Sequence, residues 1–237
     1  MTMWRRCRRY LPLVLAMGTP AHADDPVLAP GRDPAGTAVV VLADGFDYTR
    51  ADVAKVLARD GEGEAIAWDA VDGDHRPFAR DGRGTDLALA AAARGGVRVV
   101  MVRVAPRDAA SLAQGLAFAA ATPARIVLVE FDDEAKAALD VLKAAVQRFD
   151  KVMIVGAVPS LGADALTESE SLPSLVLIDG GDGGRAAADT IARALGCGQA
   201  ALTGESGADL KQAFLARLKE RASPGCEPES GTKDQER

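Results

Sequence analysis

Residues Val97–Val104 read VRVVMVRV, an apolar run interrupted only by two arginines. Its β-branched composition and its length predict a strand that is buried on both faces. Residues Asp108–Ala121 follow with Leu112, Leu116 and Ala119 on one helical face. A second apolar run, ARIVLVE, then covers Ala124–Glu130. This strand–helix–strand succession is typical of a parallel sheet.

The same alternation extends in both directions along the chain. Further strands are predicted at Thr37–Leu42, Glu64–Trp68, Lys151–Val155 and Ser174–Ile178. Further helices are predicted at Ala51–Arg59, Gly84–Arg94 and Asp133–Phe149, after Gly184, and after Ser206, where Ser206 and Asp209 form a capping-box pattern. The sequence therefore predicts one three-layer α/β/α domain with a mainly parallel sheet, and a generic doubly wound nucleotide-binding domain is the alternative.

The amino-terminal 23 residues have the pattern of a secretory signal peptide. Four arginines precede the short apolar run Tyr10–Gly18, and Ala21-His22-Ala23 fits a cleavage site. Residues 24–36 then form a lead-in without periodicity, residues 37–222 form the domain, and residues 223–237 form a charged tail. The pattern predicts a secreted or periplasmic protein with no membrane association after signal removal.

Charge and cysteine content restrict the function classes. The whole chain carries a net charge of −6, and cleavage after Ala23 would remove four arginines and no acids. An acidic exported protein is a poor candidate for binding nucleic acid. Cleavage would also remove Cys7 and leave Cys197 and Cys226, for which an oxidising compartment predicts a disulfide; two independent thiols are the alternative.

Several segments carry a resemblance to a known family. They are VVVLADGFDYTRADV (39–53), WDAVDGDHRPFARDGRGTDL (68–87), SLAQGLAFAAATPARIVLVEF (111–131), KVMIVGAVPS (151–160) and, more weakly, GGRAAADTIARAL (183–195). In order and spacing the first four resemble the characteristic segments of subtilisin-like serine peptidases (subtilases), over roughly Ala38–Leu218. The resemblance implies a shortened subtilisin-like fold, because the family has more strands before its serine-bearing helix.

The catalytic residues of that family are replaced in this chain. The resemblance places Ala43 at the aspartate position, Arg83 at the histidine position, Arg185 at the serine position, and Val158 or Pro159 at the oxyanion asparagine. Arginine cannot act as a general base, and valine or proline offers no side-chain donor to an oxyanion. The resemblance therefore implies a pseudo-protease that binds an unidentified protein or peptide partner, with no cofactor.

An alternative is a serine endopeptidase whose catalytic groups have moved. The candidates are Asp44, His75 and Ser206, since His75 is the one histidine left after signal removal and Ser206 lies in a Gly-Glu-Ser-Gly sequence. Ser206 as a helix N-cap is the simpler interpretation.

Two further patterns bear on ligand binding. Asp69, Asp72 and Asp74 could bind calcium, although they lack a regular loop spacing, so a solvated acidic loop is favoured and no metal site is predicted. The glycine-rich turn Gly180–Gly184 could hold a phosphate, but it does not match a complete dinucleotide-binding motif.

Arg83 and Arg185 form the last candidate site. If both begin helices that face each other, their charges add to two positive helix ends. Either Asp44 or Asp47 compensates them in an internal cluster, or they bind an anion such as a peptide carboxylate or phosphate. The sequence favours the internal cluster because these acids are close by.

Overall fold

The computed structural model describes residues 25–130, 135–158, 170–179, 184–196 and 202–220. Its strands form one six-stranded sheet in the order β2-β3-β1-β4-β5-β6, and every neighbouring pair is parallel. The strands are β1 (Thr37–Ala43), β2 (Ala67–Asp69), β3 (Val97–Arg103), β4 (Ile126–Glu130), β5 (Met153–Val158) and β6 (Leu175–Asp179). The predicted parallel α/β fold is confirmed.

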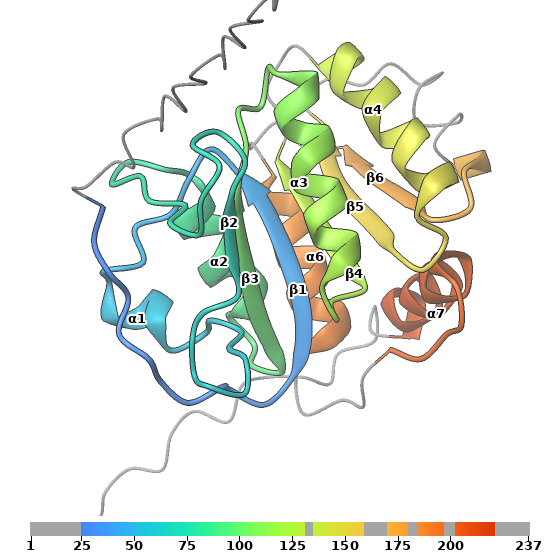
Figure 1. The fold of residues 1–237 in the computed structure, drawn as a ribbon. Coiled ribbons are helices and arrows are strands. Elements are labelled where there is room, and N and C mark those ends of the chain that lie inside the picture. The colour runs from blue at the N-terminus through green and yellow to red at the C-terminus, as the bar shows by residue number, and fades with distance from the viewer. Residues whose placement is uncertain (1–24, 131–134, 159–169, 180–183, 197–201, 221–237) are drawn as a thin grey trace, which may run out of the picture.

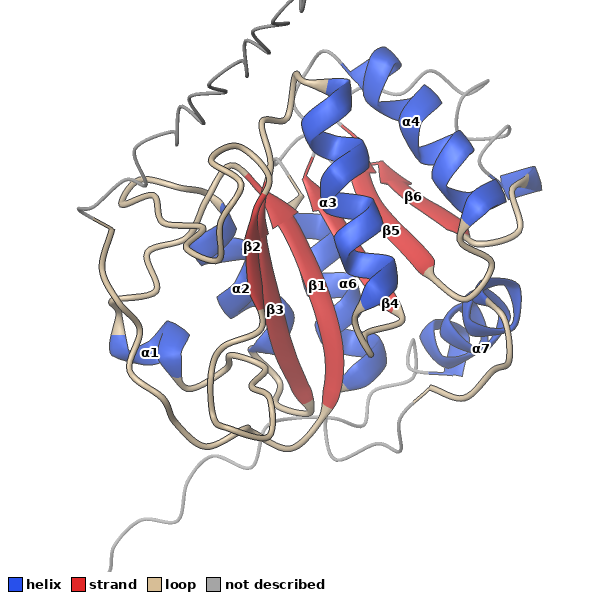
Figure 2. Ribbon diagram, in the orientation of Figure 1, coloured by secondary structure: helices blue, strands red, loops and turns tan. Residues whose placement is uncertain are grey.

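Helices cover both faces of the sheet (Figures 1 and 2). They are α1 (Ala51–Ala54), α2 (Gly84–Ala92), α3 (Ala109–Ala121), α4 (Ala135–Arg148), α6 (Arg185–Leu195) and α7 (Gly207–Glu220). Alternate residues of β1 enter two separate cores, as strand geometry requires. Val39 and Val41 pack in the cluster that contains α2, α6 and α7 residues, whereas Val40 and Leu42 pack with residues of α3 and α4.

The strand order separates this sheet from the common dinucleotide-binding arrangement. Here β1 lies between β3 and β4, and β2 is at the edge. In a Rossmann sheet, with order 3-2-1-4-5-6, the first strand is paired with the second instead. The alternative of a nucleotide-binding domain of that type therefore does not describe the observed sheet.

Two predicted elements have different boundaries. The helix expected over Ala51–Arg59 ends at Ala54, because the chain then pairs with the first half of β3, which β2 does not cover. The Ala58 N–H donates to the Val99 carbonyl, and the Val99 N–H donates to the Val56 carbonyl. The strand expected over Glu64–Trp68 is Ala67–Asp69, since the Asp60 carboxylate accepts from the Glu62 and Glu64 amides and holds Glu64 in a turn.

The described part of the lead-in, residues 25–36, has no regular secondary structure but is fastened to the domain. The buried Arg59 side chain donates to the carbonyls of Ala29 and Gly63, and the Asp33 carboxylate accepts from the Arg59 amide. Asp33 also forms an ion pair with Arg98 of β3. These contacts position residues 26–28 beside β2, where they form a wall of the pocket described below.

Candidate functional site

The carboxyl ends of the parallel strands bring charged residues to one edge of the sheet. Ala43 at the end of β1 is in register with Arg103 at the end of β3, and Arg103 is in register with Asp69 at the end of β2. On the other side of β1, Leu42 is in register with Val129, so Glu130 ends β4 beside Ala43. In open parallel sheets, ligands bind at this edge, and it is where the candidate site lies.

Arg83 is the N-cap residue of α2, and it lies at this edge. Its Nε atom lies 2.6 Å from Oε1 of Glu130 and 3.7 Å from Oδ2 of Asp44. The Arg83 amide also donates to Oδ1 of Asp44 over 2.8 Å. The Glu130 side chain is completely buried, whereas half of the Arg83 side chain is exposed. The guanidinium therefore neutralises a buried carboxylate and still reaches the surface.

Glycines allow the turn after β1 to approach the start of α2 closely. A Cβ atom on Gly84 would lie 2.6 Å from the Gly45 carbonyl oxygen and 2.7 Å from the Phe46 ring. A Cβ atom on Gly82 would lie only 2.3 Å from the same oxygen. This backbone contact holds the Arg83 amide against the Asp44 carboxylate, and any side chain at these glycines would separate them.

The start of α6 lies next to this group. Its N-cap, Gly184, has a φ of +97°, and a Cβ atom there would lie 3.4 Å from the Leu87 methyl groups and 3.6 Å from the Glu130 Cα. The amino ends of α2 and α6 therefore both lie against the end of β4. Arg185, the first residue of α6, is largely exposed and its Nε lies 3.3 Å from the Asp189 carboxylate one turn along.

Ala43, Arg83 and Arg185 thus all lie at the carboxyl edge of the sheet. The ion pair expected between Asp44 and the arginines is present for Arg83. The other acid considered, Asp47, is used locally instead: its carboxylate accepts from the amide and hydroxyl of Thr49. Asp189, not Asp44, is the carboxylate paired with Arg185.

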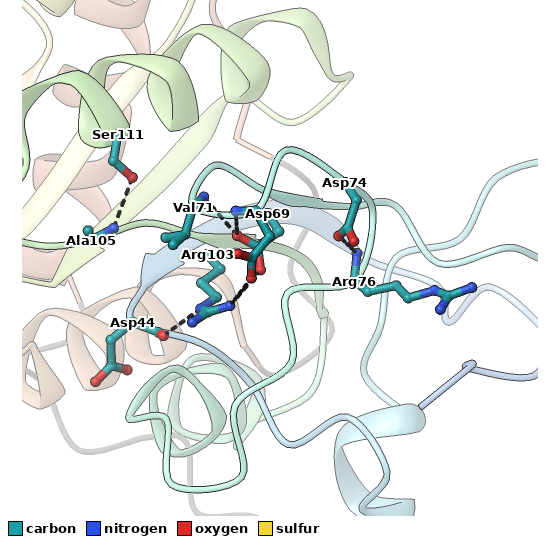
Figure 3. Close-up of polar contacts among 9 residues, drawn as sticks. Asp44, Asp69, Val71, Asp74, Arg76, Arg103, Ala105 and Ser111 are labelled. Atoms are coloured by element: carbon teal, nitrogen blue, oxygen red, sulfur yellow. Dashed lines mark hydrogen bonds and ion pairs between the residues drawn. The ribbon is translucent and has the colours of Figure 1, made fainter. Parts of the chain in front are cut away.

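A second ion-pair group lies on the β2 side of the same edge (Figure 3). Nη1 of Arg103 is 2.9 Å from Oδ2 of Asp69 and 2.8 Å from Oδ2 of Asp72, and its Nε donates to the Asp44 carbonyl. Burial disfavours the charged guanidinium, but the hydrogen bond and charge of Asp69, together with Asp72, outweigh this and raise the pKa of Arg103. Asp44 therefore contacts both arginine groups, Arg103 through its carbonyl and Arg83 through its carboxylate.

The carboxylates of the acidic loop after β2, where calcium was one interpretation of the sequence, are engaged by the protein. Asp69 and Asp72 bind Arg103, and Oδ1 of Asp69 accepts from the Val71 and Asp72 amides. Oδ1 of Asp74 accepts from the Arg76 amide. Among the residues that the structure describes, no group of three or more acidic, histidine or cysteine side chains is arranged to hold a metal ion.

The structure does not bring Asp44, His75 and Ser206 together. Ser206 caps α7: its hydroxyl donates to the Asp209 carboxylate and accepts from the Asp209 amide. Its neighbour Gly207 donates to the carbonyl of Asp150, at the amino end of β5. His75 lies beside β2, where its Nδ1 donates to the Ala67 carbonyl. Because β2 and β5 are four strands apart, they are separated by about 19 Å.

Glu130 and Arg103 are site residues that sequence reasoning did not single out. In the sequence they are simply parts of predicted strands. The available signal was position: each is a charged residue that ends an apolar strand, and parallel strand ends share an edge.

Several expectations fall outside the described residues. These are the signal peptide, the Cys197–Cys226 disulfide, Pro159, residues 180–183 of the glycine-rich turn, and the charged tail. Within the described ranges, none of the helices is both long enough and apolar enough to cross a membrane.

Comparison of the chain with protein-family models and with curated proteins finds no significant match in either set.

Proposed function

We propose that this chain is an exported, subtilisin-like domain that has lost serine peptidase activity and binds a protein or peptide partner. The six-stranded parallel α/β fold is compatible with that resemblance. So is the location of Ala43, Arg83 and Arg185, the positions matched to the family's aspartate, histidine and serine, at one edge of the sheet. Export rests on the signal-like pattern of residues 1–23.

One observation carries the loss of activity. The position matched to the catalytic histidine holds a guanidinium that is in ion contact with Glu130 and Asp44. Arginine does not deprotonate in proteins, so this side chain cannot accept a proton from a nucleophile. The matched serine position is Arg185, which has no hydroxyl to activate. An active triad at this edge would require at least three replacements.

Binding at the same edge is supported by exposure. About half of the Arg83 side chain and half of the Arg185 side chain are exposed to solvent. The Asp189 carboxylate that pairs with Arg185 is also exposed. An incoming carboxylate or phosphate could therefore exchange with Asp189 and be held by paired guanidinium hydrogen bonds. The amino ends of α2 and α6 add favourable partial charge at this point.

A fluorophosphonate probe tests the loss of activity. Such probes label an activated serine, so we expect no labelling of the purified protein under conditions in which an active subtilisin is fully labelled. The Ser206→Ala variant serves as the matched control for the displaced-triad alternative. Labelling of the wild type that disappears in Ser206→Ala would restore the peptidase assignment and overturn the proposal.

A further inference from the structure

A pocket of about 420 Å³ lies away from the edge just described, beside β2. One wall is the lead-in at Pro26–Leu28, a second is the turn that contains Asp60 and Glu64, and a third is the loop at His75–Pro77. Its volume is within the range of small-molecule sites, which lies between roughly 300 and 1,000 Å³.

The base of the pocket is apolar and held in place. Met101 of β3 and Ala67 of β2 line it and are almost completely buried. Tyr48 also lines it, and its hydroxyl donates to the Pro26 carbonyl over 2.8 Å, which fastens the lead-in wall to the domain. The base is therefore preformed, so that binding there requires little ordering of the protein.

The rim carries opposite charges on different walls. Asp60 and Glu64 come from the turn before β2, and Arg76 comes from the loop after β2. Figure 3 shows the Arg76 side chain directed away from the Asp69–Arg103 group. In the described ranges, neither the Glu64 carboxylate nor the Arg76 guanidinium forms an ion pair, and both residues are exposed.

His75 adds a directional polar group. A carbonyl oxygen can only accept, so Nδ1 of His75 donates to the Ala67 carbonyl. The edge-to-face contact with Trp68, with ring centroids 5.1 Å apart, fixes the orientation of the ring.

From this arrangement we propose that the pocket binds a small zwitterionic ligand of dipeptide size. Its ammonium group contacts Glu64 and Asp60, its carboxylate contacts Arg76, and its apolar side chain lies against the exposed Val27 of the lead-in wall. Charge complementarity with both rim walls selects this chemistry over a purely anionic or purely cationic ligand. The assignment is independent of the lost peptidase site, since Arg83 and Arg185 do not line the pocket.

Calorimetric titration with L-alanyl-L-leucine tests the proposal. We expect saturable binding to the wild type. N-acetyl-alanyl-leucine and alanyl-leucine amide should each bind about tenfold more weakly, because each lacks one charge-assisted contact. Glu64→Gln should weaken binding of the free dipeptide by a similar factor, but should not further weaken binding of the acetylated one. Arg76→Gln should behave in the same way toward the amide.

Control substitutions outside the pocket test whether the dipeptide binds at this pocket. Glu62→Gln lies in the same turn and Arg80→Gln lies near the same loop, yet neither residue lines the pocket, so both should bind like the wild type. The Arg83→Ala/Arg185→Ala variant should also bind normally, which distinguishes this site from the one under Proposed function. Absence of saturable binding to the wild type overturns the proposal, as does binding that is insensitive to Glu64→Gln and Arg76→Gln.

Discussion

The Nε atom of Arg83 lies 2.6 Å from Oε1 of Glu130, and no part of the Glu130 side chain is exposed to solvent. The two residues come from different layers, Arg83 from the start of α2 and Glu130 from the end of β4. Isolated buried carboxylates are strongly destabilising unless they are paired. The Arg83–Glu130 contact therefore joins helix and sheet at the point where the candidate site is built.

Replacing Arg83 by alanine should destabilise the fold. We expect a loss of about 1–3 kcal/mol in the free energy of unfolding, less than for a fully buried pair because half of Arg83 is exposed. Urea denaturation measures this loss. Arg185→Ala is the control: its ion pair with Asp189 is exposed, so it should change stability by less than about 0.5 kcal/mol. Equal effects of the two substitutions would contradict the structural role of the Arg83–Glu130 pair.

Anion binding at the same edge should appear as thermal stabilisation. If Arg83 and Arg185 bind phosphate, the melting temperature should rise with phosphate concentration and then saturate, as ligand linkage requires. The Arg83→Ala/Arg185→Ala variant should lose this rise, whereas Arg32→Ala, an exposed arginine of the lead-in, should keep it. The melting temperature is also measured in sulfate and in sodium chloride at the same ionic strength, to distinguish binding at the site from general salt effects. A wild-type melting temperature that does not respond to phosphate would rule out the anion site.

Gly84→Ala should disturb the contact between α2 and the turn after β1. The new methyl group would lie 2.6 Å from the Gly45 carbonyl oxygen, a backbone atom that cannot easily move. Overpacking of this kind costs about 1–3 kcal/mol. Gly61→Ala is the matched control because a Cβ atom there meets nothing within 4 Å. Thermal unfolding measures the stability of both variants. A loss of stability no larger for Gly84→Ala than for Gly61→Ala would contradict this prediction.

Tyr48 should make stability fall at alkaline pH. Burial, followed by the charge of Asp25, raises the pKa of Tyr48 from 10.0 to about 12. Below pH 10 both states keep the phenolic proton, but between pH 10 and 12 the unfolded chain loses it while the folded protein retains it. The stability contributed by Tyr48 is therefore complete below pH 10 and is lost as pH rises toward 12.

The Tyr48→Phe variant isolates this contribution. Its unfolding free energy should decline less steeply between pH 10 and 12 than that of the wild type. At neutral pH it should be lower by about 1 kcal/mol, because the Pro26 carbonyl loses its hydrogen bond. Denaturant titrations at several pH values measure both effects, and parallel pH profiles for the two proteins would refute this assignment.

Ser206 should contribute to stability as a helix cap. Ser206→Ala removes both hydroxyl contacts with Asp209 and should cost about 1 kcal/mol, as loss of an N-cap does. The hydrogen bonds with Ser206 lower the pKa of Asp209, so this capping is present above the unfolded pKa of Asp209 and is lost as pH falls through its lower folded value. The difference between wild type and variant should accordingly shrink at acidic pH. Glu205→Gln, a substitution next to the cap that leaves the Ser206 hydroxyl in place, is the control and should unfold like the wild type.

The strongest sequence patterns identified the architecture because they reflect burial on both strand faces. The apolar run at Val97–Val104 and the stripe of Leu112, Leu116 and Ala119 correspond closely to β3 and α3. Prediction failed where tertiary pairing decided the conformation. Local propensity favoured helix up to Arg59, but residues 56–58 instead form backbone hydrogen bonds with Val99, in the part of β3 that β2 does not cover.

The candidate site was only partly predictable, for a different reason. Asp44 could be paired with Arg83 because the resemblance placed both near one edge. Glu130 could not, because within ARIVLVE it resembles the polar end of any strand. Its importance depends on complete burial next to α2 and α6, which is a property of the packing between layers and has no local signature in the sequence.

The central place of β1 has a consequence for the order of folding. Val40 pairs with Val100 on one side and with Val127 on the other, both of which are synthesised long after it. The apolar run TAVVVLA therefore has no sheet partner during synthesis until β3 and β4 have also been made. Topologies of this kind fold slowly and expose an unpaired strand to self-association.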